Sequence, residues 1–258
     1  MTRDVRRTDV LDLELTAAAS VQFGLLAELW ASAGLHPMGW LAGATYAVIA
    51  GAMLIVALRR SGHRTLGPAN RVTLTRAILV GGVTALVVDA IGTRGPVVLL
   101  VTFAAVALVM DAVDGQVARR TDTVTPLGAR FDMEVDAYLI LVLSIFVSMS
   151  LGFWVLAIGA MRYAFVAAGW VLPWLRSSLP TSYARKTVAA IQGVVLVVAT
   201  AGVLPRSVTA ILVGVALALL VWSFGRDVRW LWRSRPVRSA GDRTPVRQAT
   251  VADHGHGR

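Results

Sequence analysis

The sequence predicts an all-α polytopic membrane protein, built as a helical bundle with a six-helix core plus one or two extra N-terminal membrane helices. First, 56% of the 258 residues are hydrophobic and only 16% are charged, a combination that soluble domains rarely show. Second, long segments such as 39–58, 137–161 and 207–225 carry no charge at all. Crossing a bilayer takes ~20 apolar residues in a helix. A helix also satisfies its own backbone polar groups within the segment.

The positions of the basic residues indicate the orientation of the bundle. The formal net charge is +10, and the arginines concentrate in 59–76, 119–130 and 176–186 and in the C-terminal tail. By the positive-inside rule these segments lie in the cytosol, which predicts a multi-pass plasma-membrane protein. Topology therefore accounts for the basic charge. We expect no nucleic-acid partner, because no aromatic and basic patch accompanies that charge.

The N-terminal region, residues 1–66, is predicted to hold a tail and the extra membrane helix or helices. Residues 1–14 mix acids and bases and form a polar tail. Residues 15–34 are moderately apolar but contain Gln22 and Glu28, so they either cross the membrane or lie on its surface; we favour crossing. Residues 39–58 are a clear span that ends at two arginines in the cytosol.

The six-helix core is predicted over residues 67–225. Its helices are expected at about 72–92, 96–113, 129–149, 153–172, 187–204 and 207–224. A cytosolic loop is expected over 115–128, between the second and third of them. The remaining residues, 226–258, form an Arg-rich cytosolic tail that begins as an interfacial helix and is then partly disordered.

Four aspartates in the segment "MDAVDGQVARRTDTVTPLGARFDMEVDA", residues 110–137, carry the predicted chemistry. Asp111 and Asp114 are three residues apart and Asp132 and Asp136 are four apart, so each pair shares one face of a helix. The connecting loop allows the two helix ends to lie side by side. Carboxylates this close need cations, and hard oxygen ligands without His or Cys favour Mg²⁺ or Mn²⁺. Phosphate displacement commonly uses two such ions.

Small and basic residues beside the aspartates fit a phosphate-containing substrate. Gly115 follows Asp114 directly and leaves room for a ligand to approach the backbone. Gly128 lies four residues before Asp132 and keeps that helix surface low. Arg119 is placed where a guanidinium could bind a phosphate with two hydrogen bonds. Together they predict an anionic, metal-bound phosphate substrate.

The complete string D-x-x-D-G-x-x-A-R-x8-G-x-x-x-D-x-x-x-D resembles the signature of the CDP-alcohol phosphatidyltransferase family. Its eight fixed positions are filled by Asp111, Asp114, Gly115, Ala118, Arg119, Gly128, Asp132 and Asp136. The predicted core, from about residue 68 to 225, also looks like that family. Residues 1–60 and the Arg-rich tail are not covered by the resemblance.

The resemblance implies transfer of a phosphatidyl group from a CDP-linked lipid donor to an alcohol, with release of CMP. It implies that Asp111, Asp114 and Asp132 hold the metals, and that Asp136 both holds a metal and acts as the general base. It assigns the donor site to Asn70, Thr73, Gly115, Ala118, Arg119, Thr125 and Gly128. Members of the family commonly pair as homodimers, so membrane lipids and a second copy of the chain are expected partners.

The acceptor is the least determined part of the prediction. Arg76, Arg162, Arg185 and Lys186 resemble basic residues that face the acceptor phosphate in the phosphatidylglycerophosphate synthase-like branch, which favours a phosphorylated polyol such as glycerol 3-phosphate. That branch usually has Arg-Glu at the mid-helix position where this chain has Arg162 and Tyr163. Inositol phosphate, phosphatidylglycerol or another alcohol therefore stays open.

Purely structural roles are the alternative to substrate binding for these basic residues and for one acidic residue. Arg162 could form a structural ion pair, and Arg185 and Lys186 could simply mark membrane topology. Glu134 is predicted to face away from the aspartates and to be structural, because it lies about 200° around the helix from Asp132.

Other protein classes explain the pattern less well. Membrane prenyltransferases also use paired aspartate motifs, but on well-separated helices. A transporter would explain an intramembrane Arg162 but not the combination of Gly115, Ala118 and Arg119. A catalytically idle relative that keeps the motif is the last alternative.

Overall fold

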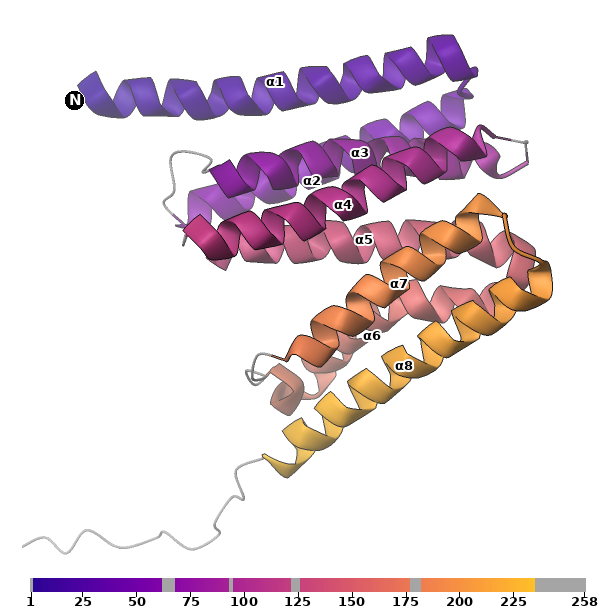
Figure 1. Cartoon of the computed structure of the whole chain (residues 1–258). Helices are drawn as coiled ribbons and strands as arrows, with labels where there is room; N and C mark the ends of the chain where they lie inside the picture. The colour runs from indigo at the N-terminus through magenta and orange to yellow at the C-terminus, as the bar shows by residue number, and fades with distance from the viewer. Residues whose placement is uncertain (1, 62–67, 93–94, 122–125, 177–181, 235–258) are drawn as a thin grey trace, which may run out of the picture.

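The computed structural model describes residues 2–61, 68–92, 95–121, 126–176 and 182–234, which fold entirely into helices and short connections (Figure 1). The α-helices of these ranges are α1 (Thr2–Ala33), α2 (Pro37–Ser61), α3 (Pro68–Ala90), α4 (Val97–Thr121), α5 (Pro126–Leu151), α6 (Leu156–Val171), α7 (Tyr183–Ala201) and α8 (Arg206–Arg233). Short 3₁₀ turns, Phe153–Val155 and Pro173–Arg176, precede and follow α6. The all-α prediction is confirmed.

Successive helices run up and down, so alternate connections meet at the same end of the bundle. The start of α3, the end of α4 and the starts of α5 and α7 lie at one end, together with the end of α8 (Figure 1). Within the described ranges, six helical segments are long and apolar enough to span a membrane: α2, α3, α5, α6 with its preceding 3₁₀ turn, α7 and α8. The chain is a multi-pass membrane protein.

Helix α3 is the central helix of the N-terminal half. It packs against α1, α2, α4 and α5, and 67% of its most apolar window is buried, compared with 22% for α2. Gly81 and Gly82 permit this close packing, because a Cβ atom at these positions would meet the side chains of Gln22 and Phe103. The central position of α3 brings Arg76 to the interface with α4 and α5.

Several predicted boundaries were wrong where charged residues interrupt the hydrophobic pattern. The expected loop over 115–128 is mostly helical, because α4 continues to Thr121 and α5 begins at Pro126. The expected polar tail over 1–14 is helical from Thr2, as part of α1. Helix α8 runs without a break to Arg233, so no separate interfacial helix begins at residue 226. Arginine is a good helix former: charge marks where a helix leaves the membrane, not where it ends.

The opposite end of the bundle is closed by tight turns. Gly152 and Gly202 have φ angles of 107° and 63°, which favour glycine, and they separate α5 from α6 and α7 from α8. Asp89, near the end of α3, accepts a hydrogen bond of 2.7 Å from the backbone nitrogen of His36, which precedes α2. This buried carboxylate therefore connects the α1–α2 turn to α3.

Candidate active site

Three of the four predicted metal-binding aspartates converge in the structure. Asp111 lies on α4, and Asp132 and Asp136 lie one turn apart on α5. One carboxylate oxygen from each residue lies within 4.8 Å of the other two. Their side chains are 39%, 32% and 36% exposed, so the cluster is accessible from one side. Asp114 is on the helical backbone of α4, but its side chain lies outside the described residues.

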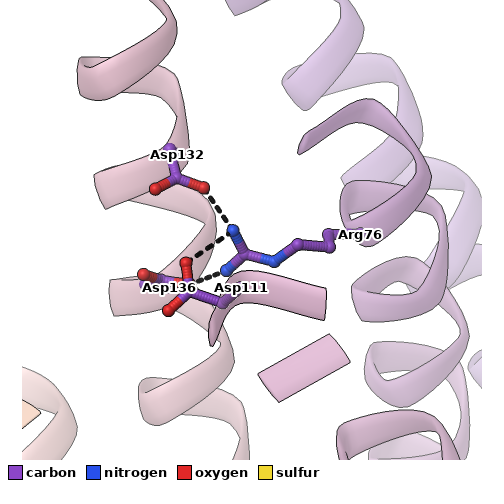
Figure 2. A network of polar contacts seen from close by, with 4 residues as sticks. All are labelled: Arg76, Asp111, Asp132 and Asp136. Atoms are coloured by element: carbon purple, nitrogen blue, oxygen red, sulfur yellow. Dashed lines mark hydrogen bonds and ion pairs between the residues drawn. The ribbon is translucent and has the colours of Figure 1, made fainter. Parts of the chain in front are cut away.

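The guanidinium of Arg76 enters this cluster from α3 (Figure 2). Its Nη1 lies 2.9 Å from a carboxylate oxygen of Asp111 and also contacts Asp132, while Nη2 contacts Asp136. The Arg76 side chain is only 1% exposed. The sequence predicted Arg76 as an acceptor-binding residue and gave no sign of this arrangement. Three carboxylates and one guanidinium leave the described cluster with a formal charge of −2.

The structure describes two of the predicted donor-binding residues, and each lies one turn before a residue of the cluster. Thr73 lies one turn before Arg76 on α3 and is 3% exposed, and Gly128 lies one turn before Asp132 on α5 and is half-buried. Asn70 is on the first turn of α3, and Gly115, Ala118 and Arg119 are on the last turns of α4, but their side chains lie outside the described residues. Thr125 lies outside them altogether. The donor contacts of these residues stay predictions.

The remaining predicted acceptor residues are distributed over α6 and α7. Arg162 on α6 forms a 2.5 Å ion pair with Glu134 of α5. This contact is the structural ion pair that the sequence offered as the alternative to acceptor binding. Arg185, in the first turn of α7, lies 3.3 Å from a carboxylate oxygen of Asp227 on α8. Lys186 is exposed. The sequence analysis missed Asp227, although an aspartate beside Arg226, just past an apolar span, was a usable signal.

A cavity of about 620 Å³ lies between α2, α3, α5 and α6. Three of the four tyrosines of the chain line it, Tyr46, Tyr138 and Tyr163, together with Glu134. The rings of Tyr46 and Tyr138 stack with 4.8 Å between their centroids. Sequence reasoning missed this group because its members come from three different helices. Glu134 faces this cavity and not the guanidinium of Arg76. The sequence predicted that its side chain points away from the aspartates.

The carboxylate cluster fits a divalent cation. Oxygen ligands lie about 2.0–2.6 Å from Mg²⁺ or Ca²⁺, so oxygens on opposite sides of one ion are about 4–5 Å apart. The 4.8 Å limit of this cluster is within that range. Arg76 provides a second indication, because its guanidinium shows that the three carboxylates gather around a positive charge.

The sequence was compared with models of known protein families. The family model described as CDP-alcohol phosphatidyltransferase matches residues 66–222, more than half of the chain. The match covers α3 to α7 and most of α8, and it includes Arg76 and all four aspartates. No curated protein and no solved structure matches the chain. Members of this family use divalent metal ions, in agreement with the carboxylate cluster. The chain belongs to the CDP-alcohol phosphatidyltransferase family, transferases of substituted phosphate groups that pass a phosphatidyl group from a CDP-alcohol to an alcohol in lipid synthesis.

Proposed function

We propose that the donor is CDP-diacylglycerol, that the acceptor is a phosphorylated polyol such as glycerol 3-phosphate, and that CMP is released. The observation that carries this proposal is the convergence of Asp111, Asp132 and Asp136 near the end of the bundle where α4 ends and α5 begins. The positive-inside rule supports a cytosolic location for that end, in the plasma membrane. There a lipid donor can keep its acyl chains in the bilayer while its head group reaches the carboxylates.

The four aspartates Asp111, Asp114, Asp132 and Asp136 would hold two ions of Mg²⁺ or Mn²⁺. When bound, such ions supply positive charge that stabilises the diphosphate and the departing CMP. The carboxylates position these charges because α4 and α5 are packed helices and not loops. Further along α4, the turn with Gly115 and Ala118 would leave space for the nucleotide, and Arg119 would bind a phosphate oxygen.

Asp136 is our candidate for the general base. It would accept the proton of the attacking hydroxyl, which requires a heavy-atom distance of about 2.6–3.2 Å in the complex. It lies one turn further into the bundle than Asp132 on the same face of α5, and its side chain is 36% exposed. Access from the open side of the cluster supports this role.

The start of α7 is the best candidate for the acceptor phosphate. Arg185 and Lys186 lie there, at the same end of the bundle as the carboxylate cluster (Figure 1). Arg162 and Arg185 already pair with carboxylates, so a phosphate would have to share them with Glu134 and Asp227. The exposed Lys186 is open to a phosphate from solvent.

One assay tests this function. Purified protein in nanodiscs receives CDP-diacylglycerol, Mn²⁺ or Mg²⁺, and one acceptor from a panel: glycerol 3-phosphate, inositol 1-phosphate, serine or phosphatidylglycerol. We expect CMP release that depends on glycerol 3-phosphate and on the metal. Release with inositol 1-phosphate or phosphatidylglycerol alone would keep the chemistry and change the acceptor, and no release with any of them would reject the proposal. The proposed homodimer is tested separately by measuring the molecular mass of the protein purified in detergent, where we expect the mass of two chains.

A further inference from the structure

We propose that Arg76 is a built-in counter-cation of the carboxylate cluster, which holds the three carboxylates together without metal and lowers their affinity for divalent metal. This inference rests on the proposed metal site. It concerns a residue of α3, whereas the predicted metal ligands come from α4 and α5.

The contacts of Arg76 are those of a counter-ion. One terminal nitrogen lies beside Asp111 and Asp132, and the other contacts Asp136, so a single guanidinium joins carboxylates from two helices (Figure 2). Guanidinium keeps its charge in proteins and presents its donors in a rigid fork. Three carboxylates with oxygens within 4.8 Å of one another would repel without such a charge. Arg76 therefore stabilises the metal-free arrangement.

The site has an inner and an outer side. The Arg76 side chain is 1% exposed, while the three carboxylates are 32–39% exposed. Arg76 thus occupies the buried side of the carboxylates and leaves their open side to solvent. A divalent ion that binds these carboxylates meets a unit positive charge in contact with the same groups. Like charges at such distances repel strongly in a partly buried site, so Arg76 must lower the affinity for metal.

The charge balance suggests why such a residue is useful. With Arg76 in place the described cluster carries −2, the charge that one divalent ion neutralises. Without Arg76 the same carboxylates carry −3 at the edge of a membrane span. The guanidinium would thus keep the helices packed while the metal is absent and keep metal exchange possible.

This role differs from a purely structural one in the sign of one measurement, the change in metal affinity. A residue that only packs the helices lowers both stability and metal affinity when it is replaced, because the site is distorted. Loss of a counter-cation also lowers the stability of the metal-free protein, but it raises the metal affinity. A residue that only binds the acceptor phosphate changes the acceptor KM and leaves the metal affinity unchanged.

The experiment uses the full chain in nanodiscs and measures two quantities for each variant. Electron paramagnetic resonance of free Mn²⁺ gives the Kd for Mn²⁺, and thermal unfolding in EDTA gives the Tm of the metal-free protein. For Arg76→Gln we expect at least tenfold tighter Mn²⁺ binding and a lower Tm, with Arg76→Lys between Arg76→Gln and wild type in both. Arg71→Gln is the matched control: Arg71 is on the same helix, is 63% exposed and pairs with Glu14, so its Kd should stay within twofold of wild type.

Equal or weaker Mn²⁺ binding by Arg76→Gln overturns the inference. If Arg76→Gln does not yield folded protein in EDTA, Arg76→Lys decides: tighter Mn²⁺ binding than wild type supports the inference, and equal or weaker binding overturns it. Absence of Mn²⁺ binding by the wild type would overturn the proposed metal site and this inference together. Normal wild-type binding with no gain in either Arg76 variant would overturn this inference alone.

Discussion

The roles assigned to Asp136 and Asp132 can be separated by replacing each carboxylate with the isosteric amide. Asp132→Asn and Asp136→Asn each remove one negative charge from the cluster, which leaves −1 in place of −2 on the described residues. Two unit charges 4 Å apart interact with about 4 kcal/mol at an effective dielectric constant of about 20. Because both side chains are about one-third exposed, we expect solvent to screen most of this energy. Each variant should then lose roughly 10- to 100-fold in Mn²⁺ affinity, or about 1.4–2.8 kcal/mol.

Only Asp136→Asn should also lose the base. General-base catalysis contributes about 10²–10⁴-fold to a rate, which is roughly 2.7–5.4 kcal/mol of the barrier. CMP release is measured at rising Mn²⁺ up to saturation, and CDP-diacylglycerol binding is measured in parallel. We expect saturating Mn²⁺ to restore much of the activity of Asp132→Asn, while Asp136→Asn binds donor but stays at least 100-fold slow. Full turnover by Asp136→Asn, or equal recovery of the two variants, would refute the assignment of Asp136 as base.

Three further predictions concern packing, the intramembrane ion pair and the acceptor. Gly159→Ala should lower the Tm and cost roughly 1–3 kcal/mol of stability, because the added Cβ would clash with the backbone of Leu141. Gly214→Ala is the control, because Gly214 on α8 faces open space and its replacement should not lower the Tm. Equal effects of the two substitutions would contradict this prediction. Glu134→Gln should lower the Tm by leaving Arg162 without its carboxylate, and adding Arg162→Gln should recover part of the loss; a strictly additive double variant would show that the pair is not coupled. Lys186→Ala should raise the KM for glycerol 3-phosphate several-fold with little change in kcat, and an unchanged KM would remove Lys186 from the acceptor site.

The aspartate cluster was predictable from the sequence because it depends on local geometry. Spacings of three and four residues fix a common helix face, and a short connection forces the ends of consecutive helices together. The same reasoning gave the helical class, since the length of a hydrophobic segment is a local property of the sequence. Helix ends were less predictable: α4 and α8 continue through arginine-rich segments that hydropathy assigns to loops or tails.

Contacts between distant helices were not predictable from one sequence. Arg76 lies 35 residues before Asp111, and nothing in its local pattern indicates that α3 packs against both α4 and α5. The tyrosines around the cavity and the pair between Arg185 and Asp227 depend in the same way on which helices are neighbours. The sequence predicted the carboxylates, and the packing of α3 brings the guanidinium of Arg76 into contact with them.

The proposed chemistry requires that these carboxylates bind a divalent ion. This requirement is tested most directly by Mn²⁺ titration of the wild-type chain and of the Asp111→Asn, Asp132→Asn double variant in nanodiscs, followed by electron paramagnetic resonance. We expect saturable binding by the wild type and at least a 100-fold loss in the double variant, with both proteins folded. The same affinity in both proteins would contradict metal binding by these carboxylates.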